Sequence, residues 1–219
     1  MQNRHNQLSA FVQHHPFGAN AQAARRPDLP SMIAMTDVDR FPDPTAVIPQ
    51  LAAGSALILR HYDSLARRAL AEKLAPRCRH HGIRLLIAND ARLALAVDAD
   101  GLHLSEAVLR QEPQHWQLWC PPHWLITAAA HTPTALRRAA AASVDAALLA
   151  PIFSTASHPG QANLGILRLT HWARTSPLPV YALGGVNSST IRRLKGCPIA
   201  GIAGIGGFQS TTPRAPCSL

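Results

Sequence analysis

Eight short apolar runs, distributed from residue 32 to residue 202, constrain the fold of this chain more than any other feature. Each run is four residues long, and amphipathic patterns with helical spacing separate most of them. Nearly continuous apolar runs are typical of parallel strands that are covered on both faces. Eight strand–helix repeats in 219 residues predict a compact (β/α)₈ TIM barrel, with a doubly wound sheet as the alternative. The runs are Met32–Met35, Ala56–Leu59, Leu85–Ala88, Gly101–Leu104, Leu125–Ala128, Ala146–Leu149, Pro179–Ala182 and Ile199–Ile202.

The two ends of the chain depart from this repeat. Residues 1–30 are rich in Gln, Asn, His and Ala, which predicts a peripheral or disordered arm before a barrel over residues 31–208. The tail, residues 209–219, contains two prolines and cannot form a normal last helix. Either that helix is absent, or the apolar segment from Leu8 to Phe17 takes its place. Helices are expected over 45–53, 63–80, 90–97, 133–142, 163–174 and 188–195, and less clearly over 105–120.

The formal net charge of +9 first suggests a nucleic-acid partner, but the basic residues are scattered in pairs on helical patterns. We therefore expect no nucleic-acid binding, and a basic balance suits anionic small ligands equally well. The four cysteines show no CxxC spacing or disulfide framework. No signal peptide is evident and no apolar run is long enough to span a membrane, so a soluble cytoplasmic protein, possibly oligomeric, is expected.

Polar residues and glycines follow the predicted strands, where barrel proteins carry their chemistry. Gly184 and Gly185 follow the seventh strand, and Gly204 and Gly206 lie at the eighth. Their backbone N–H groups are placed to bind phosphate, although glycines also serve simply to form tight turns. Asn89-Asp90 ends the third strand. Asp90 either caps the next helix or binds Mg²⁺ through its oxygens.

Three segments resemble the thiamine phosphate synthase/TenI family. The segment LLIANDARLALAVDADGLHL matches the family pattern I-N-D-x-x-x-L-A-x-x-x-x-A-D-G-x-H-L. AAAHTPTALRRAAAASVDAALLAPIFSTASHPG is similar to its histidine-containing strand end, helix and G-P-[IV]-[FY]-x-T loop, and LPVYALGGVNSSTIRRL to its glycine-rich strand. The resemblance implies a (β/α)₈ barrel that binds a thiazole phosphate in the thiamin pathway.

The resemblance implies two activities. Synthases join a pyrimidine pyrophosphate to the thiazole phosphate with Mg²⁺, whereas TenI-type tautomerases move a proton within the carboxylated thiazole ring and use no metal. By position, Arg60 matches the pyrophosphate arginine, Asn89 the pyrimidine ligand and Asp90 the metal ligand. Thr155 matches a loop threonine, and Ser157 replaces a second loop hydroxyl.

Three departures from the family pattern remove charge from the synthase site. Tyr62 and His158 stand where the pattern has lysines, and Val108 stands where it has the second metal carboxylate in G-Q-x-D. Glu106 is the nearest substitute for that carboxylate, two residues away. Loss of one contact that stabilises a leaving group commonly costs about 10²–10³-fold in rate.

His131 is retained where TenI-type tautomerases carry their acid/base histidine, although synthases often keep it too. A TenI-like tautomerase that uses His131 is therefore the first hypothesis, and a divergent Mg²⁺-dependent synthase is the second. A non-catalytic phosphate-ligand-binding or regulatory protein is the third.

Overall fold

The structure, a computed structural model, describes residues 28–38, 43–62, 66–111, 120–155 and 162–205. Several features expected from the sequence lie outside these ranges: most of the N-terminal arm with its apolar segment, the tail, and the closure of the barrel after Phe208.

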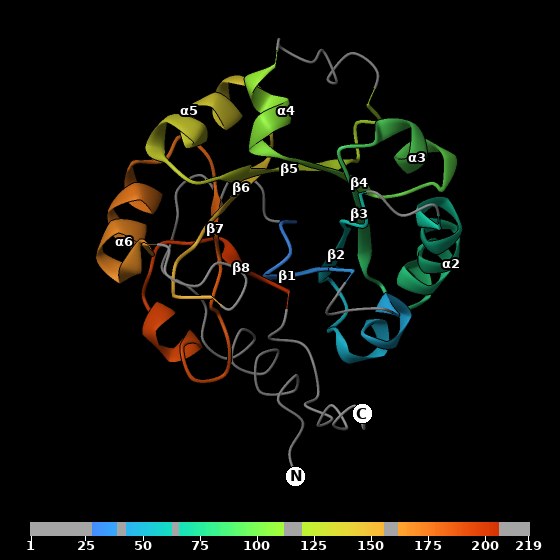
Figure 1. The fold of residues 1–219 in the computed structure, drawn as a ribbon, viewed down its shortest axis with the longest axis horizontal. Helices are drawn as coiled ribbons and strands as arrows, with labels where there is room; N and C mark the ends of the chain where they lie inside the picture. The colour runs from blue at the N-terminus through green and yellow to red at the C-terminus, as the bar shows by residue number, and fades with distance from the viewer. Residues whose placement is uncertain (1–27, 39–42, 63–65, 112–119, 156–161, 206–219) are drawn as a thin grey trace, which may run out of the picture.

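Eight parallel strands form a closed barrel in which each strand pairs with its sequence neighbours and β1 pairs with β8. Closure confirms the (β/α)₈ prediction and excludes the doubly wound sheet. Figure 1 shows the strands at the centre with the helices around them. The strands are β1 (Met32–Met35), β2 (Ala56–Leu59), β3 (Arg84–Ala88), β4 (Gly101–Leu104), β5 (Leu125–Ala130), β6 (Ala146–Leu149), β7 (Val180–Leu183) and β8 (Gly201–Gly204).

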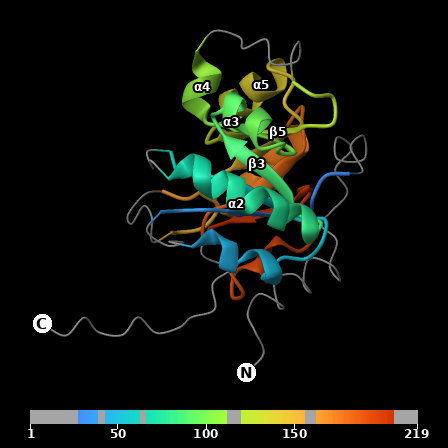
Figure 2. The same cartoon turned by 90° about the vertical axis from the view of Figure 1, so that its right-hand side faces the viewer.

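Five α-helices in the described ranges cover the outside of the barrel, and α2 crosses in front of β3 when the molecule is seen from the side (Figure 2). They are α2 (Arg67–His80), α3 (Ala91–Ala96), α4 (Glu106–Arg110), α5 (Pro133–Ala141) and α6 (Gly165–Thr175). Three 3₁₀ helices complete these segments: η2 (Pro44–Ala46), η3 (Ile48–Gln50) and η5 (Ile191–Leu194).

Two expected α-helices, 45–53 and 188–195, are 3₁₀ turns instead. Pro49 within η3 lacks the N–H that an α-helix needs at that point. Before η5, the Asn187 side chain accepts hydrogen bonds from the backbone of Ser189 and Thr190. Such side-chain bonds offer the backbone an alternative to the helical pattern. In both places local hydrogen bonding overrides the apolar periodicity.

Side chains alternate between two cores, which explains why the strand runs are apolar at every position. On β1, Ile33 and Met35 pack inside the barrel, whereas Met32 and Ala34 pack outward, in the core that includes the helices. A strand of a barrel with an outer helical layer has no solvent-facing side, so the polar alternation of a half-exposed strand is missing.

The N-terminal end of the barrel is covered by the residues just before β1. The Tyr181 hydroxyl, inside the barrel, donates a hydrogen bond of 2.6 Å to the Pro30 carbonyl. Leu29 packs against the inner core, and Asp28 lies 3.5 Å from Arg84. Residues 28–30 thus lie against the barrel.

None of the helices in the described ranges is long and apolar enough to cross a membrane.

Tyr181→Phe should lower the free energy of unfolding by about 1–3 kcal/mol, because the buried Pro30 carbonyl loses its donor. Urea denaturation measures this change. The matched control is Tyr62→Phe at the chain's other tyrosine, which is 39% exposed and should change stability by no more than about 0.5 kcal/mol. Equal effects at the two positions would contradict the role of the Tyr181 hydroxyl.

Candidate active site

A cavity of about 520 Å³ opens at the carboxyl ends of the strands. Four of the site residues predicted from the sequence line it: Arg60 after β2, His131 after β5, Thr155 after β6 and Gly184 after β7. The described lining also includes Asp37, Tyr62, His103 and Glu106. This is the face on which (β/α)₈ barrels carry their active sites.

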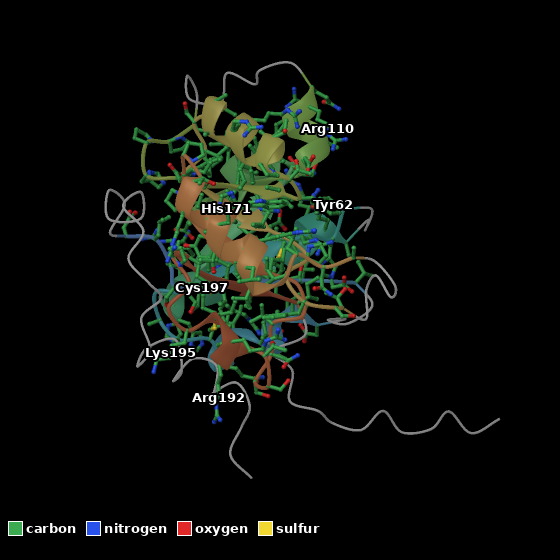
Figure 3. All side chains as sticks on the ribbon, turned by 90° about the vertical axis from the view of Figure 1, so that its left-hand side faces the viewer. Tyr62, Arg110, His171, Arg192, Lys195 and Cys197 are labelled. Atoms are coloured by element: carbon green, nitrogen blue, oxygen red, sulfur yellow. The ribbon has the colours of Figure 1, made fainter. Side chains whose placement is uncertain are left out.

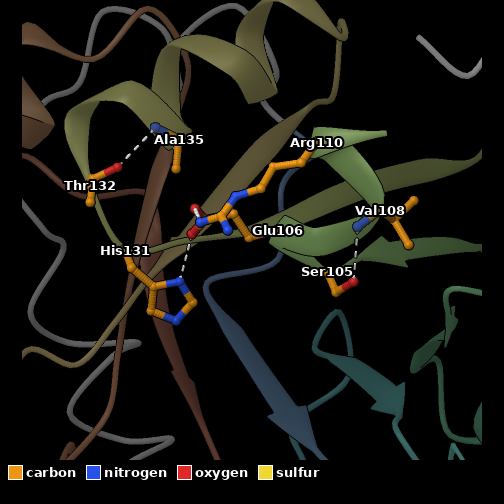
Figure 4. A network of polar contacts seen from close by, with 7 residues as sticks. All are labelled: Ser105, Glu106, Val108, Arg110, His131, Thr132 and Ala135. Atoms are coloured by element: carbon orange, nitrogen blue, oxygen red, sulfur yellow. Dashed lines mark hydrogen bonds and ion pairs between the residues drawn. The ribbon is translucent and has the colours of Figure 1, made fainter. Parts of the chain in front are cut away.

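His131 contacts a carboxylate, an interaction that was not predicted from the sequence. Its Nδ1 lies 2.7 Å from Oε2 of Glu106, and Nη2 of Arg110 lies 2.5 Å from the other carboxylate oxygen (Figure 4). Ser105 and Thr132 place these groups, because each caps the helix that follows its strand. The neighbouring strands β4 and β5 thereby bring residues 25 positions apart into contact.

The Glu106 side chain is only 10% exposed, yet its surroundings favour the ionised form. Burial raises the pKa of Glu106, but hydrogen bonds from His131 and Arg110 outweigh burial and hold the pKa below its usual value. An ionised carboxylate only accepts hydrogen bonds, so the proton in this contact belongs to His131 Nδ1. In the neutral ring, Nε2 is then the nitrogen with a lone pair.

From the sequence alone, whether Glu106 replaces the missing metal carboxylate stayed open. Its two oxygens instead have partners on His131 and Arg110. The available signal was its place just after the fourth strand, next to the strand that ends in His131.

His103 lies deeper in the cavity and has a different character. It is buried inside the barrel, and its Nδ1 lies 3.0 Å from the Thr127 hydroxyl. Burial, with a smaller contribution from Arg60, lowers the pKa of His103 to about 3. The ring is therefore neutral near pH 7 and suits hydrogen bonding better than proton exchange.

Asn89 and Asp90 hold neighbouring segments in place. Asn89 has a φ of 55°, and its side chain accepts from the Ser105 N–H and donates to the Ser105 hydroxyl. Asp90 caps α3 by accepting from the Leu93 N–H at 2.9 Å. Neither residue is among the described residues that line the cavity.

The described residues do not fit the Mg²⁺ site that the family resemblance implies. Asp90 caps a helix with Oδ1, and its Oδ2 lies 3.8 Å from the Arg67 guanidinium. In the described ranges, His, Cys, Asp and Glu form no group of three or more that could hold a metal ion. The assignment of Asp90 as a metal ligand stays a prediction.

The glycines after β7 have a steric reason to be glycine. Gly184 and Gly185 have φ values of 94° and 68°, and a Cβ on Gly185 would lie 2.5 Å from the Ser154 carbonyl oxygen. Gly184 also lines the cavity, so the turn and a phosphate site are compatible there. Gly204 pairs with Ala34 within the barrel. Gly206 and Ser157 lie outside the described residues.

The fold and the position of the cavity define a (β/α)₈-barrel protein with a cavity at the carboxyl ends of its strands. A family model described as thiamine monophosphate synthase matches residues 36–208. The chain therefore belongs to the thiamine monophosphate synthase family.

Individual relatives agree with this membership. A thiamine-phosphate synthase of Prochlorococcus marinus (strain MIT 9313) is 30% identical over 155 residues, which cover 71% of this chain but only 43% of that protein. A thiamine-phosphate synthase of Anoxybacillus flavithermus (strain DSM 21510 / WK1) is 27% identical over 178 residues, covering 77% and 81% of the two chains.

Solved structures support the fold. A thiamine phosphate pyrophosphorylase from Pyrococcus furiosus has a TM-score of 0.66 at 21% identity, covering 83% of this chain and 87% of that one. The YdjI aldolase from Escherichia coli K12 has a TM-score of 0.58 at 8% identity, covering 85% and 81%. At these identities the likeness shows the fold alone.

Gly185→Ala should destabilise the protein more than Gly165→Ala. Both glycines have a φ of 68°, so each substitution forces a left-handed conformation on alanine, at about 1–2 kcal/mol. Only at position 185 does the new Cβ also clash with backbone, which adds about 1–3 kcal/mol. Urea denaturation of both variants measures the difference in the free energy of unfolding. Equal decreases at the two positions would show that the turn accommodates the new Cβ without further destabilisation.

Proposed function

We propose that this protein is a thiamin-pathway enzyme that binds a thiazole phosphate and acts as a TenI-like thiazole tautomerase, with His131 as its acid/base. The observation that carries the proposal is the contact between His131 Nδ1 and the ionised Glu106 at the cavity. A ring with Nδ1 held in this way accepts a proton at Nε2 and returns it from the same atom.

Tautomerisation suits such a pair because the reaction has no net gain or loss of protons. Nε2 of His131 removes a proton from one position of the thiazole ring and delivers a proton to another. The Glu106 carboxylate stabilises the imidazolium that exists between the two transfers. Arg60, Thr155 and the turn at Gly184 are the cavity residues proposed to bind the phosphate.

The charges of the cavity favour a ligand with one phosphate over a pyrophosphate. Arg60 is the one arginine or lysine among the described lining residues, and Asp37 and Glu106 lie on the same lining. Tyr62 brings an aromatic ring to this wall, where the family pattern has a lysine. A pyrophosphate leaving group would need more cationic stabilisation than these residues supply.

The alternative function is a divergent thiamine-phosphate synthase, which would use a pyrimidine pyrophosphate and Mg²⁺. It is favoured by the names of the relatives and by the presence of Arg60, Asn89 and Asp90. In that case Asp90, whose Oδ1 caps α3, would also have to hold the metal.

A condensation assay separates the two functions. Purified protein is given pyrimidine pyrophosphate, the fully aromatic thiazole phosphate and Mg²⁺, and thiamine phosphate is measured. This thiazole needs no tautomerisation, so only a synthase forms product. We expect none above a protein-free control. Product that EDTA abolishes would overturn the tautomerase proposal in favour of the synthase.

His131→Ala should lower tautomerase turnover by about 10²–10⁴-fold and leave thiazole-phosphate binding within about twofold, because the ring transfers the proton but does not hold the phosphate. Turnover is followed on the carboxylated thiazole phosphate, and binding by calorimetry. The control is His171→Ala on the exposed face of α6 (Figure 3), which should change neither. Unchanged turnover in His131→Ala would exclude the assigned role. Tight binding without turnover by the wild type would instead indicate a binding protein.

A further inference from the structure

We propose that Glu106 is a positioning residue that accepts a hydrogen bond from the Nδ1–H of His131 and thereby selects Nε2 as the nitrogen that exchanges a proton at the cavity. The catalytic consequence rests on the proposed function. The tautomer itself is a property of the protein alone and can be measured without substrate.

The geometry identifies Glu106 as the fixed member of the contact. Its side chain is 10% exposed, whereas those of His131 and Arg110 are 55% and 64% exposed. Each carboxylate oxygen has its own donor, Oε2 toward His131 and Oε1 toward Arg110 (Figure 4). A carboxylate held at both oxygens cannot rotate freely, so it orients the more exposed imidazole ring rather than following it.

Because Glu106 is charged, only one neutral tautomer of His131 can donate a hydrogen bond to it. A carboxylate that stays ionised can only accept, so the Nε2–H tautomer would place two acceptors 2.7 Å apart. The other ionisable groups that line the cavity in the described ranges are Asp37, Arg60, Tyr62 and His103. The recorded donors to Glu106 are His131 and Arg110.

Glu106 departs from the family pattern at this position. In the G-Q-x-D stretch the residue at the position of Glu106 is glutamine. An amide accepts through its oxygen or donates through its nitrogen, so it tolerates either tautomer of a neighbouring histidine. An ionised glutamate at the same place only accepts hydrogen bonds, so it favours the tautomer with the proton on Nδ1.

Glu106→Gln tests the proposal, because the two side chains have nearly the same shape. The ¹⁵N chemical shifts of the imidazole nitrogens distinguish the two neutral tautomers, and the signals of His131 are assigned by their loss in His131→Ala. In the wild type, at a pH where the ring is neutral, we expect His131 as the Nδ1–H tautomer. In Glu106→Gln we expect a mixture. A wild type that carries the proton on Nε2, or a variant that keeps the wild-type tautomer, would overturn the proposal.

A matched control is available on α2, where Arg68 and Glu72 form an i,i+4 ion pair of the reverse order at 3.2 Å and lie away from the cavity lining. Glu72→Gln should leave the His131 signals and the turnover unchanged. Glu106→Gln should lower the kcat for tautomerisation by about 10–100-fold with little change in KM, as for other carboxylate-oriented histidines. If the wild type shows no tautomerase activity, the proposed function fails, and the tautomer measurement still decides the role of Glu106. An unaltered kcat together with an altered tautomer would contradict the catalytic consequence.

Discussion

The backbone pairing of β1 with β8 is the contact on which the rest of the structure depends. It aligns Met32, Ile33 and Ala34 with Ile202, Ala203 and Gly204 and turns an open parallel sheet into a barrel. Glycine at position 201 permits the close approach, because a Cβ there would lie 2.3 Å from the Ser31 carbonyl oxygen. Closure brings the carboxyl ends of all eight strands to one rim, and without it Arg60, His131 and Gly184 would not share a cavity.

The chemistry of that rim depends on one buried carboxylate. Burial raises the pKa of Glu106, and the hydrogen bonds that His131 and Arg110 donate hold that pKa below its usual value. Under the proposed function, the same charge orients His131 and makes the cavity less suited to a pyrophosphate. The structure thus brings to one cavity the retained histidine and Tyr62, which stands where the family pattern has a lysine.

Much of the fold could be predicted because strand identity is a local property of this chain. The runs Met32–Met35, Ala56–Leu59, Gly101–Leu104 and Ala146–Leu149 match the observed strands at both ends. The failures are equally local: around Pro49 and before Ile191, a missing N–H and side-chain hydrogen bonds replace the expected α-helix by 3₁₀ turns. The sequence allowed two interpretations of Asp90, a helix cap or a Mg²⁺ ligand, and the structure shows the cap.

The sequence by itself determined the barrel architecture, the family and the set of residues at the strand ends. The tertiary structure alone decided which of them meet. His131 and Glu106 are 25 residues apart, and only the parallel pairing of β4 with β5 places a carboxylate oxygen 2.7 Å from the imidazole. Asp90 and Arg67 are also brought together by the fold, because α2 and β3 lie between them in the sequence. Periodicity and motifs specify which segments form strands, but contacts between strand ends arise from the register and closure of the sheet.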